Sequence, residues 1–467
     1  NFILSSFPRG FDIPAWKLIR LWIAEGLIKS KPAFTLEETA QYYLNGLVSR
    51  NLVMVISKKP DGQIKRCRAQ NMLHEFCKLE ASRKWFFQEI SSADLDQAIV
   101  SIHDPSTSRR LCIKSSPLHD FLSTTPFAEH VRSFYCFSTR QIELPPSNIK
   151  SLCKAFPLIR VLDIESLKFV FSKEFNQLFH LRYIAFSGDF VVLPLAFGKF
   201  WNIQTLILNT SASTLEIKAD IWNMLRLRHV HTNIPAKLPS PSTSSGKASG
   251  LQTLSQVALE SCKKDVLAKA CNLKKLSIRG PMMAFLETNN GGHINLEELK
   301  YLEELKLLND VLYGSKVLHL PPSFVRILRT VKKLTLSKTM FDWDEANSLG
   351  NLESLEVLKL KENAFTGKSW NPEIGGFLQL QVLWIEGAPD LETWEASKAH
   401  FPRLRHLVLK SCENLEAVPF ELADVCSLQE MRLENTSKAA KYAKEIEINK
   451  LESDIKFKLT ILPPETD

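Results

Sequence analysis

The chain has 467 residues, more than one compact hydrophobic core usually serves, so we expect at least two structural units. Hydrophobic residues make up 45% and charged residues 24%, and no apolar run reaches the roughly 18 residues that a membrane span needs. The net charge of +8 favours acidic partners without implying nucleic acid. The nine cysteines show neither CxxC pairs nor zinc-ligand spacing, which indicates free thiols in a reducing compartment and no metal site.

Residues 1–81 carry helix and hairpin signals. Pro14 suits the first turn of a helix, and Gly26 suits the end of the same helix. Thr35 and Glu38 form a capping box ahead of a second helix. The expected elements are helices at 14–26, 36–49 and 72–81 and strands at 52–56 and 64–67. Two helices followed by a β-hairpin make a winged-helix pattern, so we assign residues 1–81 to a small winged-helix domain.

A winged helix often binds DNA, and its second helix would then read the major groove. In this chain that helix, over 36–49, contains Glu37 and Glu38 and has no Lys or Arg. Helices that read the major groove need cations for phosphates and Arg, Asn or Gln for bases. Only Gln41 and Asn45 meet part of that need. The sequence therefore favours packing against protein over binding DNA.

Residues 105–434 are dominated by one repeated motif, apolar-x-x-apolar-x-apolar. Copies recur every 22 to 29 residues. Aligned on the middle apolar residue, the copies fall at Leu162, Ile184, Leu206, Val230, Leu254, Leu276, Leu305, Leu334, Leu358, Leu383, Leu407 and Met431. Two weaker copies at Leu111 and Phe134 bring the total to about fourteen irregular repeats.

The spacing within each copy explains why the copies must stack. Alternate residues of a strand lie on the same face, so the two apolar residues at the end of the motif point to one side. One strand cannot bury that side alone, whereas stacked copies form a parallel sheet over a continuous core. We therefore predict an α/β fold in which a leucine-rich-repeat solenoid, a horseshoe, follows the winged helix. Such a solenoid is built to bind a protein surface and not to catalyse a reaction.

Three segments lie outside the regular repeats. Residues 82–104 are assigned to a linker. Residues 235–250 are rich in Pro, Ser and Gly and are expected to form a mobile insertion. Residues 435–467 are assigned to a C-terminal cap, because Ala439, Ala443 and Ile446 follow at helical spacing among charged residues.

The side chains next to the central apolar residue of each repeat should line the concave face. The predicted protein-binding residues there are Lys275, Lys306, Lys333, Lys359, Lys361, Trp384, Lys410 and Arg432. The lysines from Lys275 to Lys361 would form a positive strip that docks an acidic surface, although they could equally serve to keep the sheet soluble. Tyr183 and His229 are expected as further exposed anchors on this face.

Three stretches carry a resemblance to a known family. They are FPRGFDIPAWKLIRLWIAEGLI, ETAQYYLNGLVSRNLV and CRAQNMLHEFCKLEA. They resemble the winged-helix end of plant NB-ARC immune receptors, and the repeats resemble the leucine-rich-repeat domain of the same family. The nearest group is the coiled-coil class of disease resistance proteins, of the late-blight-resistance type, and the resemblance covers essentially the whole chain.

The resemblance implies an intracellular receptor that recognises pathogen effectors or guarded host proteins. In that family the repeats restrain an ADP-bound nucleotide domain, and recognition leads to exchange for ATP, assembly and local cell death. The implied partners are an effector or guarded protein, the receptor's own NB-ARC and coiled-coil domains, and other receptor copies on activation. The expected location is cytoplasmic, with a peripheral membrane location left open.

Two departures from the family pattern concern the nucleotide. No G-x-x-x-x-G-K-S/T phosphate loop occurs, so we expect no cofactor in this chain and assign ADP or ATP to a longer parent. The family's Met-His-Asp motif falls on Ala69, Gln70 and Asn71, which makes Gln70 and Asn71 a degenerate nucleotide latch. Either a loosened resting state or a decayed receptor copy would account for this change. His74 is expected to be an ordinary helix residue.

Other classes of function fit the sequence less well. No G-x-S-x-G or H-E-x-x-H motif occurs, so we expect no enzyme and no catalytic residues. An intracellular repeat scaffold or a ubiquitin-ligase substrate adaptor is the alternative, but the adaptor would need a helical bundle where the winged helix stands. A cell-surface receptor would need a signal peptide and a membrane span.

Overall fold

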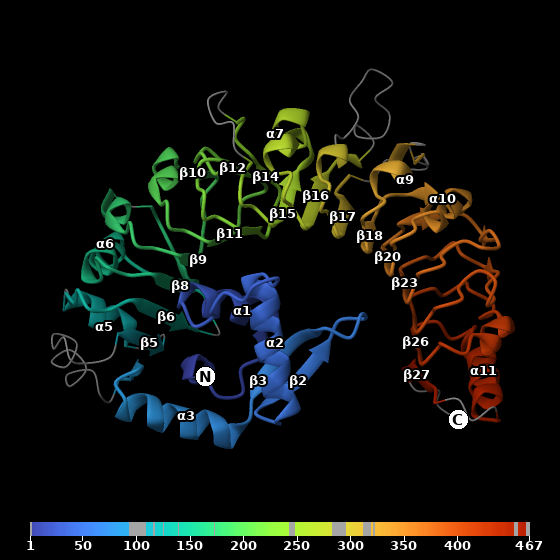
Figure 1. The fold of residues 1–467 in the computed structure, drawn as a ribbon, viewed down its shortest axis with the longest axis horizontal. Coiled ribbons are helices and arrows are strands. Elements are labelled where there is room, and N and C mark those ends of the chain that lie inside the picture. The colour runs from blue at the N-terminus through green and yellow to red at the C-terminus, as the bar shows by residue number, and fades with distance from the viewer. Residues whose placement is uncertain are drawn as a thin grey trace. The chain divides into compact units, whose positions relative to one another are not determined.

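The computed structural model describes residues 2–92, 109–114, 117–124, 126–138, 140–171, 173–241, 248–282, 296–311, 319–320, 323–452 and 456–463. The chain divides into two compact units, Asn1–Leu251 and Gln252–Asp467. Figure 1 labels the helices and strands of both.

The first part of unit 1 is the winged helix. Its elements are η1 (Phe2–Ser6), β1 (Ile13–Pro14), α1 (Ala15–Ala24), α2 (Leu36–Ser49), β2 (Val53–Lys58), β3 (Ile64–Ala69) and α3 (Asn71–Arg83). The capping box is present, since the Thr35 hydroxyl accepts from the Glu38 amide at 3.2 Å and the Glu38 carboxylate accepts from the Thr35 amide at 2.8 Å. β1 pairs antiparallel with β3 and adds a strand to the expected hairpin. The predicted winged helix is confirmed.

The rest of unit 1 is a series of parallel repeats. Its strands are β4 (Gln88–Ile90), β5 (Arg110–Lys114), β6 (Ser133–Phe137), β7 (Ile142–Glu143), β8 (Val161–Lys168), β9 (Tyr183–Gly188), β10 (Val192–Leu193), β11 (Thr205–Thr210), β12 (Leu215–Ile217), β13 (His229–Thr232) and β14 (Ala236–Lys237). Its helices are α5 (Leu118–Ser123), α6 (Pro146–Ala155), η2 (Lys173–Gln177) and η3 (Leu195–Lys199). The main parallel order is β4-β5-β6-β8-β9-β11-β13.

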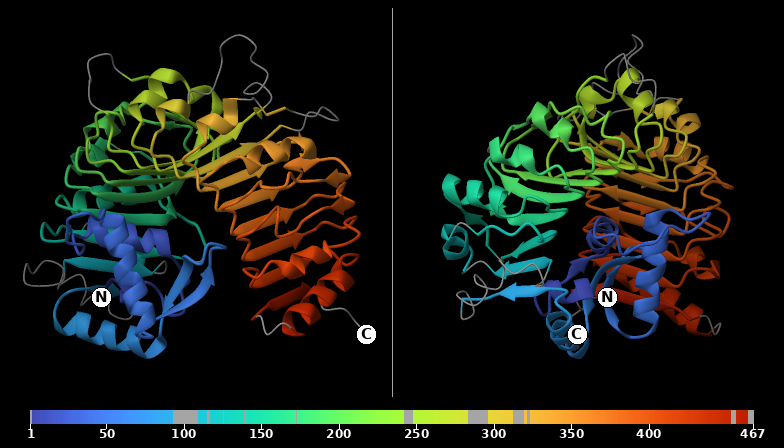
Figure 2. Two further views of the ribbon diagram at one scale, coloured as in Figure 1. Left: turned by 45° about the vertical axis from the view of Figure 1, so that its right-hand side comes forward. Right: turned by 60° about the vertical axis from the view of Figure 1, so that its left-hand side comes forward.

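Unit 2 is also built of parallel repeats, and its main strands have five or six residues each (Figure 2). Its strands are β15 (Thr253–Ala258), β16 (Lys275–Gly280), β17 (Glu304–Asn309), β18 (Lys333–Ser337), β19 (Phe341–Asp342), β20 (Val357–Lys361), β21 (Phe365–Thr366), β22 (Ser369–Trp370), β23 (Val382–Glu386), β24 (Thr393–Trp394), β25 (His406–Lys410), β26 (Glu430–Glu434) and β27 (Lys458–Leu462). Its helices are η4 (Leu259–Ser261), α7 (Lys264–Lys269), η5 (Leu296–Glu298), α9 (Ser323–Ile327), η6 (Trp343–Glu345), α10 (Ala346–Gly350), η7 (Phe420–Asp424) and α11 (Ala440–Glu452).

The strand register matches the alignment made on the middle apolar residues. In unit 1, Leu162 lies opposite Ile184, and Ile184 lies opposite Leu206. In unit 2, Leu305 lies opposite both Leu276 and Leu334. Buried and half-buried residues alternate along β17, as a strand with one core face requires. The predicted leucine-rich-repeat solenoid is therefore confirmed.

The segments outside the regular repeats hold more structure than expected. Part of the expected linker forms β4, which pairs with β5, and part of the expected cap forms β27, which pairs with β26. Within the expected insertion, Ala236–Lys237 forms β14 and pairs with β12, while 242–247 lie outside the described residues. Backbone hydrogen bonding to a neighbouring repeat orders these segments despite their weak apolar pattern. The domain boundaries themselves stay a prediction.

Candidate functional site

The winged helix packs on one face of the sheet in unit 1, namely the face that is turned away from the core of the repeats. Every residue of α1 except Trp16 is buried, and α1 shares one hydrophobic cluster with residues of β6, β9 and β11. Leu18, Leu21 and Trp22 are fully buried in that cluster. Figure 1 shows α1 alongside β8, β9 and β11. The winged helix and the first repeats therefore form one continuous core.

Lys17 forms the most buried ion pair of this contact. Lys17 is 8% exposed, and its Nζ lies 2.9 Å from Asp163 and 2.6 Å from Glu165, two carboxylates carried by β8. Burial works against the charge of Lys17, but the two carboxylates outweigh it and raise the pKa of the lysine. Burial raises the pKa of Asp163, which is 1% exposed. A buried charge with its partner removed is strongly unfavourable, so this pair fixes α1 to β8.

Glu25, at the end of α1, anchors the other end of the helix. One carboxylate oxygen accepts hydrogen bonds from the hydroxyls of Ser133 and Tyr135, each at 2.5 Å. The other accepts from Arg110 Nε at 2.8 Å. The Glu25 side chain is 3% exposed, so these charge-assisted bonds replace its water. Burial, followed by the charge of Glu25, raises the pKa of Tyr135 and keeps its hydroxyl a donor.

The helix α2 contributes a third contact through its first turn. Glu37 accepts from Arg228 at 2.6 Å and lies 3.0 Å from His229 Nε2. The other nitrogen of His229 lies 3.3 Å from Arg20 of α1. Trp16 stacks on His231, with 4.6 Å between ring centroids. The first turn of α2 is thus engaged with the repeats, whereas Gln41 and Asn45, further along the helix, form an exposed hydrogen bond with each other.

Tyr183 and His229, expected as exposed anchors, are instead covered. Tyr183 is fully buried and His229 is 3% exposed, because α1 and α2 lie over their strands. That expectation was wrong, since the repeat pattern places both residues on the solvent side of the sheet but cannot show that another domain occupies that side. Asp163 is a second example. The strand pattern alone predicts that its side chain is exposed to solvent, whereas the winged helix buries it.

The predicted binding residues of unit 2 divide into three rows across the strands. In one outer row, Glu304 lies between Lys275 and Lys333 in the register. In the other, Lys361, Glu386, Lys410 and Glu434 follow in register on successive strands. The remaining four predicted residues lie in the central row, and they are Lys306, Lys359, Trp384 and Arg432.

Ion pairs within this face reduce its charge without cancelling it. Glu304 lies 3.3 Å from Lys275 and 3.1 Å from Lys306. Glu386 lies 2.6 Å from Lys361 and 3.5 Å from Lys410. The pKa of Glu386 is lowered because these cations outweigh the opposing effect of burial. Each acid is thus shared between two cations, and the face keeps an excess of positive charge.

The two latch positions lie where β3 meets α3. Gln70 is the half-buried residue that precedes α3, and among the described residues its side chain makes no capping bond; Asn71 is exposed. Both are neutral amides, and the sequence has no phosphate loop to join them. The residues of this chain therefore do not by themselves form a nucleotide site. His74, one turn later, lies 2.9 Å from the Phe7 carbonyl and is 7% exposed, which is a structural role.

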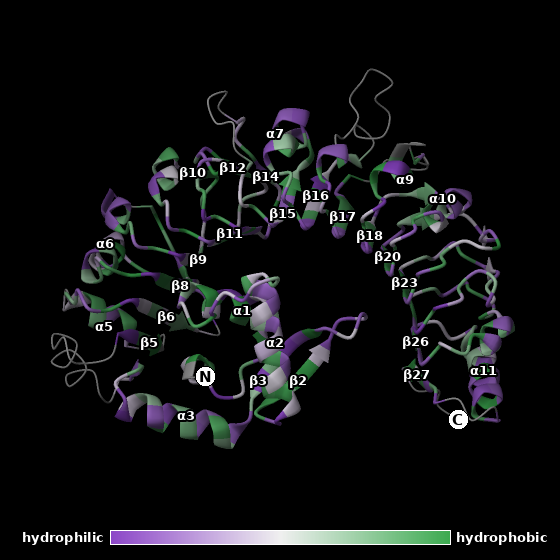
Figure 3. Ribbon diagram, viewed as in Figure 1, coloured by the Kyte–Doolittle hydropathy of each residue, from purple (hydrophilic) through white to green (hydrophobic). Residues whose placement is uncertain are grey.

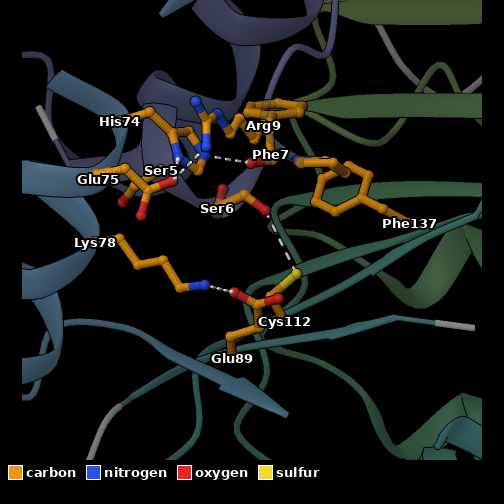
Figure 4. A pocket seen from close by; sticks show the side chains of 11 residues that line it. Ser5, Ser6, Phe7, Arg9, His74, Glu75, Lys78, Glu89, Cys112 and Phe137 are labelled. Atoms are coloured by element: carbon orange, nitrogen blue, oxygen red, sulfur yellow. Dashed lines mark hydrogen bonds and ion pairs between the residues drawn. The ribbon is translucent and has the colours of Figure 1, made fainter. Parts of the chain in front are cut away.

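A cavity of about 190 Å³ lies beside His74, between η1, α3 and the first repeats (Figure 4). Its charged groups are paired with one another, with 2.6 Å between Lys78 and Glu89 and 3.9 Å between Arg9 and Glu75. The Cys112 thiol lies 3.4 Å from the Ser6 carbonyl. The cavity belongs to the contact between winged helix and repeats. Figure 3 shows hydrophobic and hydrophilic residues mixed along α3.

Two further features limit the chemistry of the chain. Within the described residues, no group of three or more His, Cys, Asp or Glu side chains is arranged to hold a metal ion. All nine cysteines are free thiols, and all but Cys271 and Cys426 are buried. No helix in the described part of the chain is long and apolar enough to cross a membrane.

Comparison with known proteins supports the resemblance noted above. A sequence model described as the disease resistance protein winged helix domain matches residues 7–77, and one described as a leucine-rich repeat region matches 130–454. A late blight resistance protein homolog of Solanum demissum is 32% identical over 481 residues, covering 98% of this chain and 60% of that protein. A second homolog from the same plant is 30% identical over 461 residues, covering 96% of this chain and 34% of that protein.

The chain thus spans between about a third and three-fifths of the length of these relatives. Among solved structures, a leucine-rich-repeat protein of Leptospira interrogans covers 80% of this chain with 13% identity and a TM-score of 0.41, and 99% of that protein is matched.

Proposed function

We propose that this chain, which belongs to the leucine-rich-repeat family and carries the winged helix of plant disease resistance proteins, is the sensing and restraining arm of an immune receptor. Its first repeats would hold the winged helix still, and its later repeats would bind a pathogen effector or a guarded host protein. The contact of Lys17 with Asp163 and Glu165 carries this proposal, because a buried ion pair between two domains forms only in one fixed arrangement.

Restraint in this proposal is a two-state equilibrium. In the closed state, α1 and α2 lie on the repeats, with Glu25 bound to residues of β5 and β6 and Glu37 to His229 of β13. In the open state, those carboxylates return to water. A partner shifts this equilibrium only if it binds the open state more tightly than the closed one. The nucleotide chemistry of activation lies in the longer parent protein.

Release of Glu25 tests the restraint directly. The full-length gene would be expressed in leaf tissue with Glu25→Ala, and cell death would be scored without any pathogen. Glu25→Ala leaves Arg110 and two hydroxyls without their acceptor, so we expect spontaneous cell death. The matched control is Lys368→Gln, which breaks an exposed ion pair with Glu392 outside the predicted binding residues and should stay silent.

The latch positions need their own comparison. Gln70→His in the same gene restores the family's histidine. A lower background of cell death than the natural sequence would indicate that Gln70 loosens the resting state. Silence of every variant, with normal protein levels, would contradict the restraint proposal and favour a scaffold without switch function.

A further inference from the structure

The central row of unit 2 is the set of residues in register with Lys306 on successive strands. Its members are Ser277, Lys306, Thr335, Lys359, Trp384, Val408, Arg432 and Thr460. In the strands that the structure describes, the charged members of this row are all cations. The acids of the face stand in the two outer rows, so a partner that meets the central row meets positive charge first.

The middle of the central row is apolar and rigid. Trp384 is half-buried, and its Nε1 donates to Glu386 at 3.1 Å, which fixes the plane of the ring. The Nζ atoms of Lys359 and Lys361 each lie 5.4 Å from the centre of the indole ring. Val408 is the next member of the row and is also half-buried. An indole held in this way beside an aliphatic residue is a typical anchor of protein interfaces.

Unit 1 has an equivalent central row, and a helix covers that row. The covered row of unit 1 therefore shows what kind of element the central row of unit 2 can bind. There the row runs through Cys112, Tyr135, Asp163, Ala185, Ile207 and His231. The amphipathic helix α1 crosses these strands, with Lys17 on Asp163 and Trp16 on His231. The apolar members Ala185 and Ile207 belong to the same buried cluster as α1. One ion pair and a set of apolar contacts thus seat a helix across the row.

Unit 2 carries the opposite charge on the same row. We propose that the central row of unit 2 binds an acidic amphipathic helix of a partner protein, laid across the strands as α1 is laid across unit 1. This inference rests on the proposed sensing function and names the chemistry of what is sensed. Acidic residues of the helix would meet Lys306, Lys359 and Arg432, and apolar residues would meet Trp384 and Val408.

The strand spacing sets the spacing of residues on that helix. Neighbouring strands lie about 4.8 Å apart, and a helix rises about 1.5 Å per residue. Lys359 is two strands from Lys306, about 9.6 Å, which corresponds to about six or seven helical residues. Trp384 follows after one strand, or about three or four residues, and Arg432 after two more strands, or about six or seven residues. Residues at those intervals share one helical face, because each interval is close to a whole number of turns.

The probe is a labelled synthetic helical peptide of about 20 residues built on those intervals. Glutamates stand at its first, eighth and nineteenth positions, and leucines at its twelfth and fifteenth. Its partner probe carries lysine in place of each glutamate. Binding to the complete chain would be followed by fluorescence anisotropy at low and at physiological salt. We expect the acidic peptide alone to bind, and its affinity to fall as salt rises.

Two lysines of β20 provide a matched pair of variants. Lys359→Gln removes a central-row charge, whereas Lys361→Gln removes an outer-row charge two residues away on the same strand. We expect Lys359→Gln to weaken binding by about two- to fivefold and Lys361→Gln to have a smaller effect. Trp384→Ala should weaken binding by roughly tenfold or more, because it removes the apolar anchor. Unchanged circular dichroism of each variant would show that it folds.

Three outcomes would overturn the inference. They are equal binding of the acidic and basic peptides, equal losses in the two lysine variants, or full binding by Trp384→Ala. Displacement of the acidic peptide by single-stranded RNA of similar length, at lower concentration than unlabelled peptide, would assign the face to nucleic acid and also overturn it. The peptide assay and the leaf assay of Glu25→Ala can fail independently. If the acidic peptide does not bind but Glu25→Ala still causes cell death, this inference is wrong and the restraint proposal stands.

Discussion

Replacing Lys17 by methionine is the sharpest test of the contact between winged helix and repeats. Methionine keeps the length of the apolar stem but leaves the Asp163 carboxylate, which is 1% exposed, without its cation. Removing one partner of a buried ion pair costs about 3–5 kcal/mol. Glu165 adds little to this cost, because its side chain is 36% exposed and reaches water.

Native-state hydrogen exchange measures that loss locally. Since about 1.4 kcal/mol corresponds to a tenfold change, the amides of α1 and α2 should exchange roughly 10²- to 10⁴-fold faster in Lys17→Met. The second variant, Lys17→Met with Asp163→Leu, replaces both charges by apolar groups and should recover the natural protection or exceed it. The reasoning is refuted if the amides of α1 and α2 in Lys17→Met exchange as slowly as in the natural chain. It is also refuted if those amides exchange as fast in the double variant as in Lys17→Met.

The loss in Lys17→Met should also depend on pH. Burial raises the pKa of Asp163 above its ordinary value of 3.8, so the folded state holds this proton more tightly than the unfolded chain does. Protonation of Asp163 therefore favours the folded state as the pH falls toward 3.8. In Lys17→Met the same protonation removes the unpaired negative charge of Asp163. The difference in exchange between Lys17→Met and the natural chain should narrow from pH 7.5 to pH 5. A difference that stays constant over this range would count against an unpaired Asp163 as its cause.

Three other predictions address single features. Glu386→Gln should remove up to about 1 kcal/mol of stability at neutral pH. Because the folded pKa of Glu386 is lowered, that contribution is present above about 4.5 and is lost as the pH falls through the lowered value, so urea unfolding of the variant and the natural chain should converge in acid. Lys450→Met should speed hydrogen exchange in α11, because the fully buried ammonium donates to the Ala423 and Val425 carbonyls at 3.0 and 2.8 Å. The Val425 carbonyl keeps its bond from the Leu428 amide, so the loss falls mainly on the Ala423 carbonyl, at a cost of about 1–3 kcal/mol. Gly188→Ala should destabilise the chain, because its Cβ would lie 2.5 Å from the Phe169 carbonyl, whereas Gly46→Ala, in an open part of α2, should stabilise it by about 0.5–1 kcal/mol; thermal unfolding compares the two.

The elements of the fold could be predicted because their signals are local. The helix over 36–49 was placed to the residue by its capping box, and the repeat register followed from the period of apolar residues. Strands β4 and β27 were missed because their neighbours in the stack, and not their own residues, hold them in place. Lys458 precedes the short apolar part of β27 and Pro463 follows it, which hides the likeness of this segment to a repeat.

The contact between the two domains could not be predicted from local patterns. Lys17 and Asp163 are separated by 146 residues, and each alone resembles an ordinary surface charge. A signal was nevertheless present, since Lys17 and Arg20 are the only polar residues of α1, and a helix with so many apolar residues must be largely buried. A lysine on such a helix needs a buried acid, and Asp163 stands in the middle of an apolar strand. Only the fold brings the two together.

The most direct test of the restraint proposal uses the same two variants in the full-length gene. Lys17→Met should cause cell death in leaf tissue without a pathogen, because it loosens α1 from β8. Lys17→Met with Asp163→Leu should cause no more cell death than the natural gene at matched protein levels, because apolar side chains restore the contact without charge. Cell death from both variants, or from neither, would contradict the proposal that the first repeats restrain the receptor by holding its winged helix.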